Sequence, residues 1–339
     1  MNIVDLRSDT VTKPTPKMIR AMFKAKLGDD VLEEDPTVKI LEKKTAELFG
    51  TEDALFCPSG TMTNQIAIKL HTQPMSEVIC DKLSHVYNYE TGGIAFNSAA
   101  SVRTLNGDRG RFTASELIEN INPDNIHHPI SSLVCVENTT NKGGGAFWDF
   151  QEIKKIHQVC NLHKLKFHMD GARIFNALTE TKLNPAEYGK IFDTISICFS
   201  KGLGAPIGSV LLGNKQDIER AKRIRKVLGG GMRQAGLLAA AAIYALDNHI
   251  ERLNIDHERA RHLGETINKL PFVSELLPVD TNILVFNLVD SYPKEKFIEK
   301  MNNNQIKVIG FGKQTIRMVT HLDINNKMIQ KVIRTLKLL

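Results

Sequence analysis

Two reactive side chains follow two short apolar segments of the chain, and together they suggest one kind of chemistry. Lys201 ends the run Ile-Ser-Ile-Cys-Phe-Ser-Lys, and 31 residues earlier Asp170 ends the run Phe-His-Met-Asp. Both apolar runs are typical of buried strands, and ligands bind at the carboxyl ends of strands in an open α/β sheet. A lysine there can form a Schiff base with an aldehyde, and an aspartate can pair with a pyridinium nitrogen. The two residues therefore suggest pyridoxal phosphate (PLP) as a cofactor.

Both residues also have an ordinary interpretation. Lys201 could be a surface lysine after a strand, although Gly202 and Gly204 beside it allow the backbone to turn tightly against a bulky ring. Asp170 follows apolar residues, and a buried carboxylate is normally paired, so a salt bridge with Arg173 is the alternative to pairing with a cofactor.

A third segment has the residues that a phosphate site needs. Ser59, Gly60 and Thr61 join a predicted strand to a predicted helix, where free backbone N–H groups and the helix dipole favour an anion. An ordinary helix cap is the alternative. The segment is not a Walker loop, and the chain has no usable GxGxxG motif, which argues against a nicotinamide cofactor.

Among the histidines, His85 is the candidate for catalysis, because it follows a predicted strand at residues 77–80. Its ring could stack on a flat cofactor and exchange protons near neutral pH. His157, His163 and His168 lack the spacing of metal ligands, so we expect structural roles for them and no metal.

The composition is that of an ordinary globular protein rather than a nucleic-acid-binding or membrane protein. The net charge is +6, but 44 Lys and Arg face 38 Asp and Glu and are spread along the 339 residues. The longest apolar stretch, residues 235–246, is too short to span a bilayer, and the first residues lack the apolar core of a signal peptide. Five cysteines without CxxC spacing are typical of reduced thiols, so we expect a cytoplasmic location.

Strand and helix patterns alternate from about residue 15 to residue 245. Strands are predicted at residues 54–57, 77–80, 132–137, 166–169, 194–199 and 209–212, with helices such as 36–49, 61–70 and 150–163 between them. This alternation predicts an α/β domain with a mostly parallel sheet, over residues 1–247. Residues 248–339 contain helical and β-rich segments that predict a smaller α+β domain.

The chain resembles the low-specificity L-threonine aldolases, which belong to the fold-type-I PLP enzymes and share the fold of aspartate aminotransferase. The resemblance depends on motifs that run in order along nearly the whole chain. They are Asp5-Leu-Arg-Ser8-Asp9-Thr10, Gly28-Asp-Asp-Val31, Pro58-Ser-Gly-Thr61, His85, Glu137-Asn-Thr, His168-Met-Asp170-Gly-Ala-Arg173-Ile-Phe-Asn-Ala, Ser200-Lys201-Gly-Leu-Gly, Arg225-Lys226-Val-Leu-Gly-Gly-Gly-Met-Arg233-Gln and Arg317-Met-Val-Thr-His321.

The resemblance implies a role for each matching residue. Lys201 would carry the Schiff base, Asp170 would hold the pyridine nitrogen and His85 would stack on the ring. The phosphate would lie at Ser59, Gly60 and Thr61. The substrate carboxylate would be bound by Ser8, Arg173 and Arg317, and Arg173 would also lie at the cofactor. The resemblance also implies a homotetramer in which Lys226 reaches the phosphate of a neighbouring subunit.

Two positions depart from the family pattern. Thr140 stands where the family usually has a histidine near the β-hydroxyl of the substrate, and Leu32 stands where an aromatic residue is usual. Thr140 cannot act as a base near neutral pH. We therefore expect His85, or a water held by His85 and the phosphate, to take the hydroxyl proton.

The expected reaction is the retro-aldol cleavage of L-threonine or L-allo-threonine to glycine and acetaldehyde. The same cofactor would also serve an amino-acid racemase or a β-eliminating lyase, so these alternatives remain open. A PLP-binding protein without catalytic activity is a further alternative.

Overall fold

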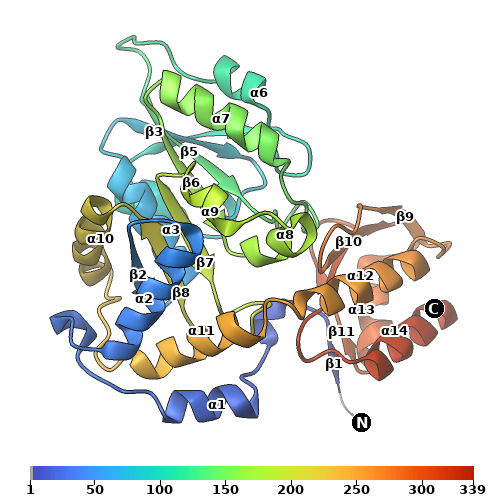
Figure 1. Ribbon diagram of the computed structural model, residues 1–339. Coiled ribbons are helices and arrows are strands. Elements are labelled where there is room, and N and C mark those ends of the chain that lie inside the picture. Colours follow the sequence, from blue (N-terminus) through green and yellow to red (C-terminus); the bar gives the residue numbers. More distant parts are fainter. Residues whose placement is uncertain (1–2) are drawn as a thin grey trace.

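A seven-stranded sheet forms the centre of the larger part of the chain (Figure 1). The structure is a computed structural model and describes residues 3–339. The strands, in spatial order, are β2 (Asp53–Cys57), β8 (Ser209–Gly213), β7 (Thr194–Cys198), β6 (Lys166–Gly171), β5 (Ile130–Glu137), β3 (Ser76–Asp81) and β4 (Ser101–Leu105). Only β8 is antiparallel to its neighbours, so the sheet is mostly parallel, as predicted.

Helices cover both faces of this sheet, because the strands are apolar on both sides. Leu55 and Cys57 of β2 pack with Ile66 of α3 in one apolar cluster, whereas Ala54 and Phe56 belong to the main core on the other face. The helices of this part are α1 (Pro16–Phe23), α2 (Pro36–Phe49), α3 (Gly60–His71), α4 (His85–Asn88), α5 (Gly93–Ser98), α6 (Ala114–Glu119), α7 (Phe150–Leu162), α8 (Ile174–Thr181), α9 (Pro185–Gly189), α10 (Lys215–Val227) and α11 (Gly236–Asn248).

Local capping residues explain why several predicted helices agree with the structure. The side chain of Asp35 accepts hydrogen bonds from the backbone N–H groups of Thr37 and Val38, and Pro36 occupies the first turn of α2. Gly50 ends the helix with a φ of 64°, a left-handed conformation that favours glycine. Both signals are local in the sequence, so the helix could be predicted at residues 36–49.

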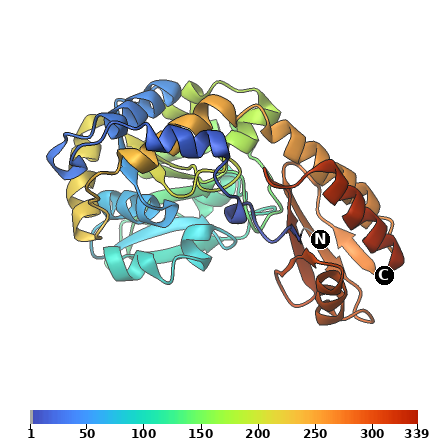
Figure 2. The same ribbon diagram turned by 90° about the horizontal axis from the view of Figure 1, so that it is seen from below.

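A second, smaller core lies beside the large sheet and includes both ends of the described chain (Figures 1 and 2). Its antiparallel sheet has the order β12 (Ile309–Gly310), β13 (Thr315–Val319), β10 (Ile283–Leu288) and β9 (Val273–Leu276). Its helices are α12 (Leu253–Ile267), α13 (Lys294–Asn303) and α14 (Asn326–Leu338). The N-terminal strand β1 (Val4–Asp5) pairs in parallel with β11 (Ile306–Lys307), so the start of the chain packs against this C-terminal part.

The α/β fold predicted from the sequence is confirmed, although several elements were not predicted. Among these are β4, α8 and α10; α10 has a polar sequence, and only one side of it is buried. The predicted boundary at residue 247 falls at the end of α11. Among the described residues, no helix combines the length and the apolar character needed to cross a membrane.

Candidate active site

The carboxyl ends of two adjacent parallel strands bring the predicted lysine and aspartate to one cavity. β6 pairs with β7, Asp170 is the next-to-last residue of β6, and Lys201 lies three residues after β7 ends. The cavity has a volume of about 150 Å³. It is lined by Ser59, Gly60, Thr61, Asn64, His85, Asp170, Ala172, Cys198, Ser200 and Lys201. The structure therefore gathers six of the predicted site residues in one place.

A tight turn fixes the backbone of Lys201. The N–H of Gly204 donates to the carbonyl oxygen of Lys201 at 2.8 Å, and Gly204 has a φ of 75°. The hydroxyl of Thr12 donates to the same carbonyl at 3.2 Å. The Lys201 amine itself lies 3.5 Å from the thiol sulfur of Cys198, inside the cavity. The lysine is thus held at the site rather than on the open surface.

The N-terminus of α3 opens onto the same cavity. Ser59 caps this 12-residue helix, and its hydroxyl accepts the N–H of Met62 at 3.2 Å. The first N–H groups of a helix lack intrahelical partners, and together with the helix dipole they favour an anion. Gly60 and Thr61 therefore stand where a phosphate group can be bound, on a helix that also fills the space behind the site.

Asp170 is buried, with 3% of its surface exposed, and both of its carboxylate oxygens accept hydrogen bonds. The N–H of Ala172 donates to Oδ1 at 3.1 Å, and the side-chain amide of Asn64 donates to Oδ2 at 2.9 Å. The alternative that Asp170 pairs with Arg173 is wrong, because the Arg173 guanidinium pairs with Asp9 instead.

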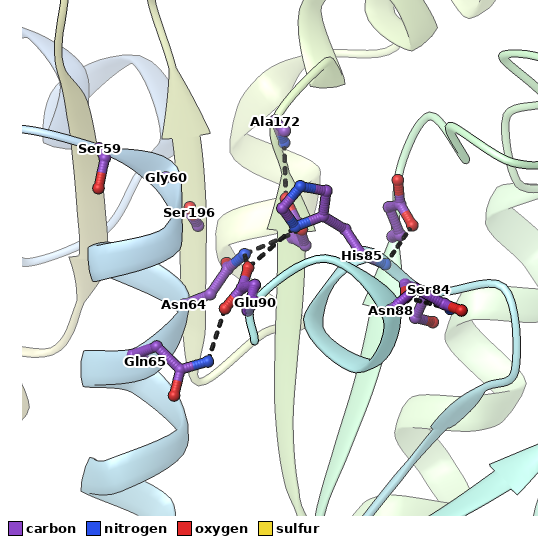
Figure 3. A network of polar contacts seen from close by, with 12 residues as sticks. Ser59, Gly60, Asn64, Gln65, Ser84, His85, Asn88, Glu90, Ala172 and Ser196 are labelled. Carbon is purple, nitrogen blue, oxygen red and sulfur yellow. Dashed lines mark hydrogen bonds and ion pairs between the residues drawn. The ribbon is translucent and has the colours of Figure 1, made fainter. Parts of the chain in front are cut away.

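His85 contacts the buried carboxylate of Glu90, which was not predicted from the sequence. Glu90 accepts hydrogen bonds from Asn64 at 2.9 Å and from Gln65 at 2.6 Å (Figure 3). The Nδ1 atom of His85 lies 3.0 Å from the same carboxylate. Burial lowers the pKa of His85, but the hydrogen bond to Glu90 and the charges of nearby carboxylates outweigh it, so the net pKa is raised. A nitrogen of His85 and a carboxylate oxygen each of Glu90 and Asp170 all lie within 4.8 Å of one another.

Glu137 is a second buried carboxylate behind the site, at the end of β5. It accepts the backbone N–H of His85 and that of Asn141, both at 2.9 Å. Burial, and then the charge of Asp170, raise the pKa of Glu137 to about 7. Glu137 thus connects the segment that carries His85 to the segment that carries Asn141.

The two arginines predicted to bind the substrate carboxylate, Arg173 and Arg317, are not among the residues that line the cavity. The Arg173 guanidinium donates to both oxygens of Asp9, at 2.8 and 2.7 Å, and this pair is almost completely buried. Arg317 donates to Asn141 at 2.7 Å and to the backbone oxygen of Arg7 at 3.0 Å. Its Nε atom is buried and has no hydrogen-bond partner within residues 3–339.

The charge of Arg317 is only partly compensated. Burial and the nearby Arg173 charge lower the pKa of Arg317 to about 10, so the guanidinium stays charged at neutral pH. A guanidinium whose positive charge is only partly compensated favours an anion nearby, such as a carboxylate. This is the property that a substrate-carboxylate site requires.

The other predicted residues lie outside this cavity. Ser8 caps the 3-10 turn Asp9–Val11. Lys226 is exposed on α10 and lines a separate cavity of about 450 Å³. The hydroxyl of Thr140 donates to the carbonyl of Ala146 at 3.3 Å. Leu32 is 63% exposed.

Four buried polar residues that contact the predicted site residues were not predicted from the sequence. They are Asp9, Asn64, Glu90 and Glu137. Asp9 and Glu137 belong to motifs named above, whereas the other two lie shortly after Thr61 and His85 in the chain. The available signal was the polar character of residues placed inside apolar segments, since a buried polar group needs a partner.

These groups fit PLP. The cavity combines an amine that can hold an aldehyde, a carboxylate for a pyridine nitrogen, a helix N-terminus for a phosphate and an imidazole beside them. Arg317, outside the cavity lining, adds a partly compensated positive charge that favours a carboxylate nearby.

Comparison with known proteins gives a consistent picture. Residues 5–291 match the beta-eliminating lyase family. The chain is 39% identical to the probable low-specificity L-threonine aldolase 2 of Arabidopsis thaliana over 337 residues, which cover 97% of this chain and 95% of the plant protein. It is 38% identical to the low specificity L-threonine aldolase of Escherichia coli K12, with 97% of both chains covered. The structure of threonine aldolase from Leishmania major superposes with a TM-score of 0.86 over 98% of both chains, at 23% identity, and shows the same fold.

Proposed function

The chain belongs to the beta-eliminating lyases, among the low-specificity L-threonine aldolases, and on this premise we propose that it cleaves L-threonine and L-allo-threonine to glycine and acetaldehyde. The protein is a PLP-dependent lyase. The observation that carries the proposal is the meeting of Lys201, Asp170 and the N-terminus of α3 in one cavity. The partly compensated positive charge of Arg317 supports an amino-acid substrate.

When bound, PLP would supply an electron sink for the pair released on cleavage of the Cα–Cβ bond. Lys201 would hold the aldehyde carbon of the cofactor through its amine. Asp170 would accept a hydrogen bond from the protonated pyridine nitrogen, and the Asn64 amide and the N–H of Ala172 would hold its carboxylate in place. Ser59, Gly60 and Thr61 would hold the phosphate.

The substrate carboxylate would bind at Arg317 and at Ser8, which directly precedes Asp9 in the chain. Arg173 contributes through its buried pair with Asp9, which leaves one terminal nitrogen of the guanidinium for a further partner. A bound carboxylate fixes the amino acid at one end, so that the bond to be broken can be oriented.

His85 would take the proton of the β-hydroxyl at Nε2. Its Nδ1 atom is engaged by Glu90, so in the neutral ring the lone pair is on Nε2. Thr140 cannot take this role, because its hydroxyl is directed to the carbonyl of Ala146 and does not ionise near neutral pH.

The test is product analysis with purified protein and added PLP. We expect L-threonine and L-allo-threonine to yield equal amounts of glycine and acetaldehyde. An inverted amino acid would instead favour a racemase, and a keto acid with ammonia a β-eliminating lyase. Absence of any product with these substrates would contradict the proposed function.

The exchange of Glu90 for glutamine is expected to change the pH dependence of cleavage. Without the Glu90 charge the pKa of His85 falls, so the neutral ring persists to lower pH and the acidic limb of the kcat profile moves to lower pH. A glutamine amide can also donate to Nδ1 and place the proton on Nε2, so kcat should fall about tenfold at the optimum. The measurement is kcat between pH 5 and pH 9, at saturating threonine.

A matched control is Glu77→Gln. Glu77 and Glu90 are both 5% exposed, but Glu77 pairs with Arg103, away from the cavity. If Glu90→Gln leaves the acidic limb in place, or if Glu77→Gln moves it equally, His85 is not the base that Glu90 tunes.

The oligomeric state and compartment are part of the same proposal. We expect a homotetramer in which the exposed Lys226 reaches the phosphate of a neighbouring subunit, as the family resemblance implies; light scattering after gel filtration would measure its mass. Five free, buried cysteines support a reducing compartment such as the cytoplasm, where the enzyme would contribute to threonine breakdown and glycine supply.

A further inference from the structure

A buried chain of hydrogen bonds leads from Asp170 along the face of the sheet that α3 covers. His168 and Asp170 are two residues apart on β6 and so lie on the same face. Asn64 of α3 joins Asp170 to His168, and its Oδ1 atom lies 3.1 Å from His168 Nε2. The hydroxyl of Thr194, on β7, lies 3.0 Å from His168 Nδ1. His71 is the last residue of α3, and its Nε2 atom lies 3.1 Å from the same hydroxyl. His71 is only partly buried, so this series of hydrogen bonds ends near the surface.

The orientation of the Asn64 amide is fixed by two carboxylates. Its nitrogen lies 2.9 Å from an oxygen of Asp170. The same nitrogen lies 2.9 Å from an oxygen of Glu90 (Figure 3). Carboxylates accept hydrogen bonds, so the two N–H groups of the amide face them, one each. The amide oxygen must then face His168, whose Nε2 atom must carry a hydrogen to donate to it.

The protonation of His168 follows from its burial. The ring is fully buried, and burial lowers the pKa of His168 to about 4, so the ring is neutral at physiological pH. A neutral ring with hydrogen on Nε2 has its lone pair on Nδ1, which accepts from the Thr194 hydroxyl. The Thr194 carbonyl also lies 3.1 Å from Nδ1, but a hydrogen placed there would leave Nε2 without one for Asn64.

We propose that His168 and Asn64 are positioning residues, which hold the Asp170 carboxylate in the place and orientation needed by the pyridine nitrogen of the cofactor. The same amide donates to Glu90, so the carboxylate that faces the cofactor and the carboxylate that orients His85 are held by a single group. The inference rests on the proposed function only for the identity of the cofactor.

The hydrogen bond from His168 is needed as well as its volume, because an apolar residue at position 168 would leave Asn64 Oδ1 buried without a donor. The Asn64 side chain, 1% exposed, has little access to water as a replacement. The amide would then lose the contact that sets its direction, and Asp170 and Glu90 would lose a fixed donor. A buried polar group without a partner is costly, so a local rearrangement is expected.

The experiment compares His168→Phe and His168→Gln with the parent. Holoenzyme is dialysed against graded PLP concentrations, and the retained cofactor and its visible circular dichroism are measured. We expect His168→Phe to bind PLP about tenfold more weakly, with an altered dichroism band. In His168→Gln the side-chain amide can still donate to Asn64, so most of the affinity and the parental band should return.

His257→Phe is the matched control for the loss of a buried, doubly hydrogen-bonded histidine. His257 is also fully buried, and its ring nitrogens contact Glu180 and Asn176. This variant should lose thermal stability while keeping the parental affinity for PLP and the parental band.

Three results would overturn the inference. They are parental PLP binding and dichroism in His168→Phe, equal effects of His168→Phe and His168→Gln, or the same cofactor defect in His257→Phe. The readout does not require threonine cleavage. A parent protein that binds PLP but cleaves no threonine would therefore remove the proposed function and leave this inference to be decided by the variants.

Discussion

Replacing Lys201 with alanine is expected to lower kcat for threonine cleavage by about 10⁴-fold or more, the size of loss that follows removal of a nucleophilic residue in other enzymes. In the proposed mechanism, the amine of Lys201 is the nucleophile, and it lies in the cavity that holds Asp170, His85 and the N-terminus of α3. Without it the cofactor can still be held by the phosphate and pyridine contacts, but it loses its covalent attachment. The measurement is glycine release at saturating threonine and PLP.

A second readout identifies the attachment directly. Borohydride reduction followed by peptide mass spectrometry should place the cofactor on the peptide of the parent that contains Lys201, and on no peptide of the alanine variant. Lys190→Ala is the control, because Lys190 is an exposed lysine whose partner is the surface residue Glu187. Cleavage by Lys201→Ala at the parental rate would contradict the mechanism.

The exchange of Asp9 for alanine is expected to lower the free energy of unfolding by about 3–5 kcal/mol, the usual cost of leaving one member of a buried ion pair without its partner. The Arg173 side chain is 6% exposed and that of Asp9 is fully buried, and two hydrogen bonds join them. After the exchange the Arg173 charge remains in the interior beside Arg317. The measurement is urea unfolding at one fixed PLP concentration, because a bound ligand also stabilises the folded state.

The stability difference should depend on pH with a defined sign. Burial raises the pKa of Asp9, but the charges of Arg173, Lys201 and Arg317 outweigh it and hold the net pKa well below the ordinary value of 3.8. The unfolded chain therefore binds the proton first as the pH falls. The contribution of Asp9 is fully present above pH 3.8 and is lost as the pH falls through the folded-state pKa, so the parent and the variant should converge in acid.

The double variant Asp9→Ala with Arg173→Met separates pairing from packing. Removing both charges should recover much of the lost stability, because the unpaired buried guanidinium is gone. A single variant that loses less than about 1 kcal/mol, or a double variant no more stable than the single one, would show that the pair is solvated enough to be dispensable.

Much of the fold could be predicted because its signals are local. Asp35, Pro36 and Gly50 mark the ends of α2, and continuous apolar runs mark the strands that are covered on both faces. The pairing of strands could not be predicted at the same level. β8 lies between β2 and β7 and is antiparallel to both. β1 pairs with β11, which lies about 300 residues away in the sequence.

The candidate site was likewise predicted only in part, because some of its contacts join residues far apart in the sequence. Lys201 and Asp170 were identified because reactive residues at strand ends meet at one edge of a parallel sheet. Asp170 was considered as a partner of Arg173, but the partner is Asp9. Asp9 lies 164 residues away in sequence, yet its Oδ1 atom is only 2.7 Å from a guanidinium nitrogen of Arg173. His168 was expected to have a structural role, yet its ring is the link between Thr194 and Asn64 behind Asp170.

The sequence by itself therefore determined many but not all of the helices and strands, the class of sheet and the cofactor that Lys201 and Asp170 can serve, because these depend on residue type and on short-range periodicity. Only the tertiary structure decided which donors and carboxylates meet: Glu90 with His85, Asp9 with Arg173, and Asn64 with two carboxylates at once. A hydrogen bond requires its atoms within about 3 Å, and for residues on different elements that distance is set by packing and strand order rather than by spacing in the sequence.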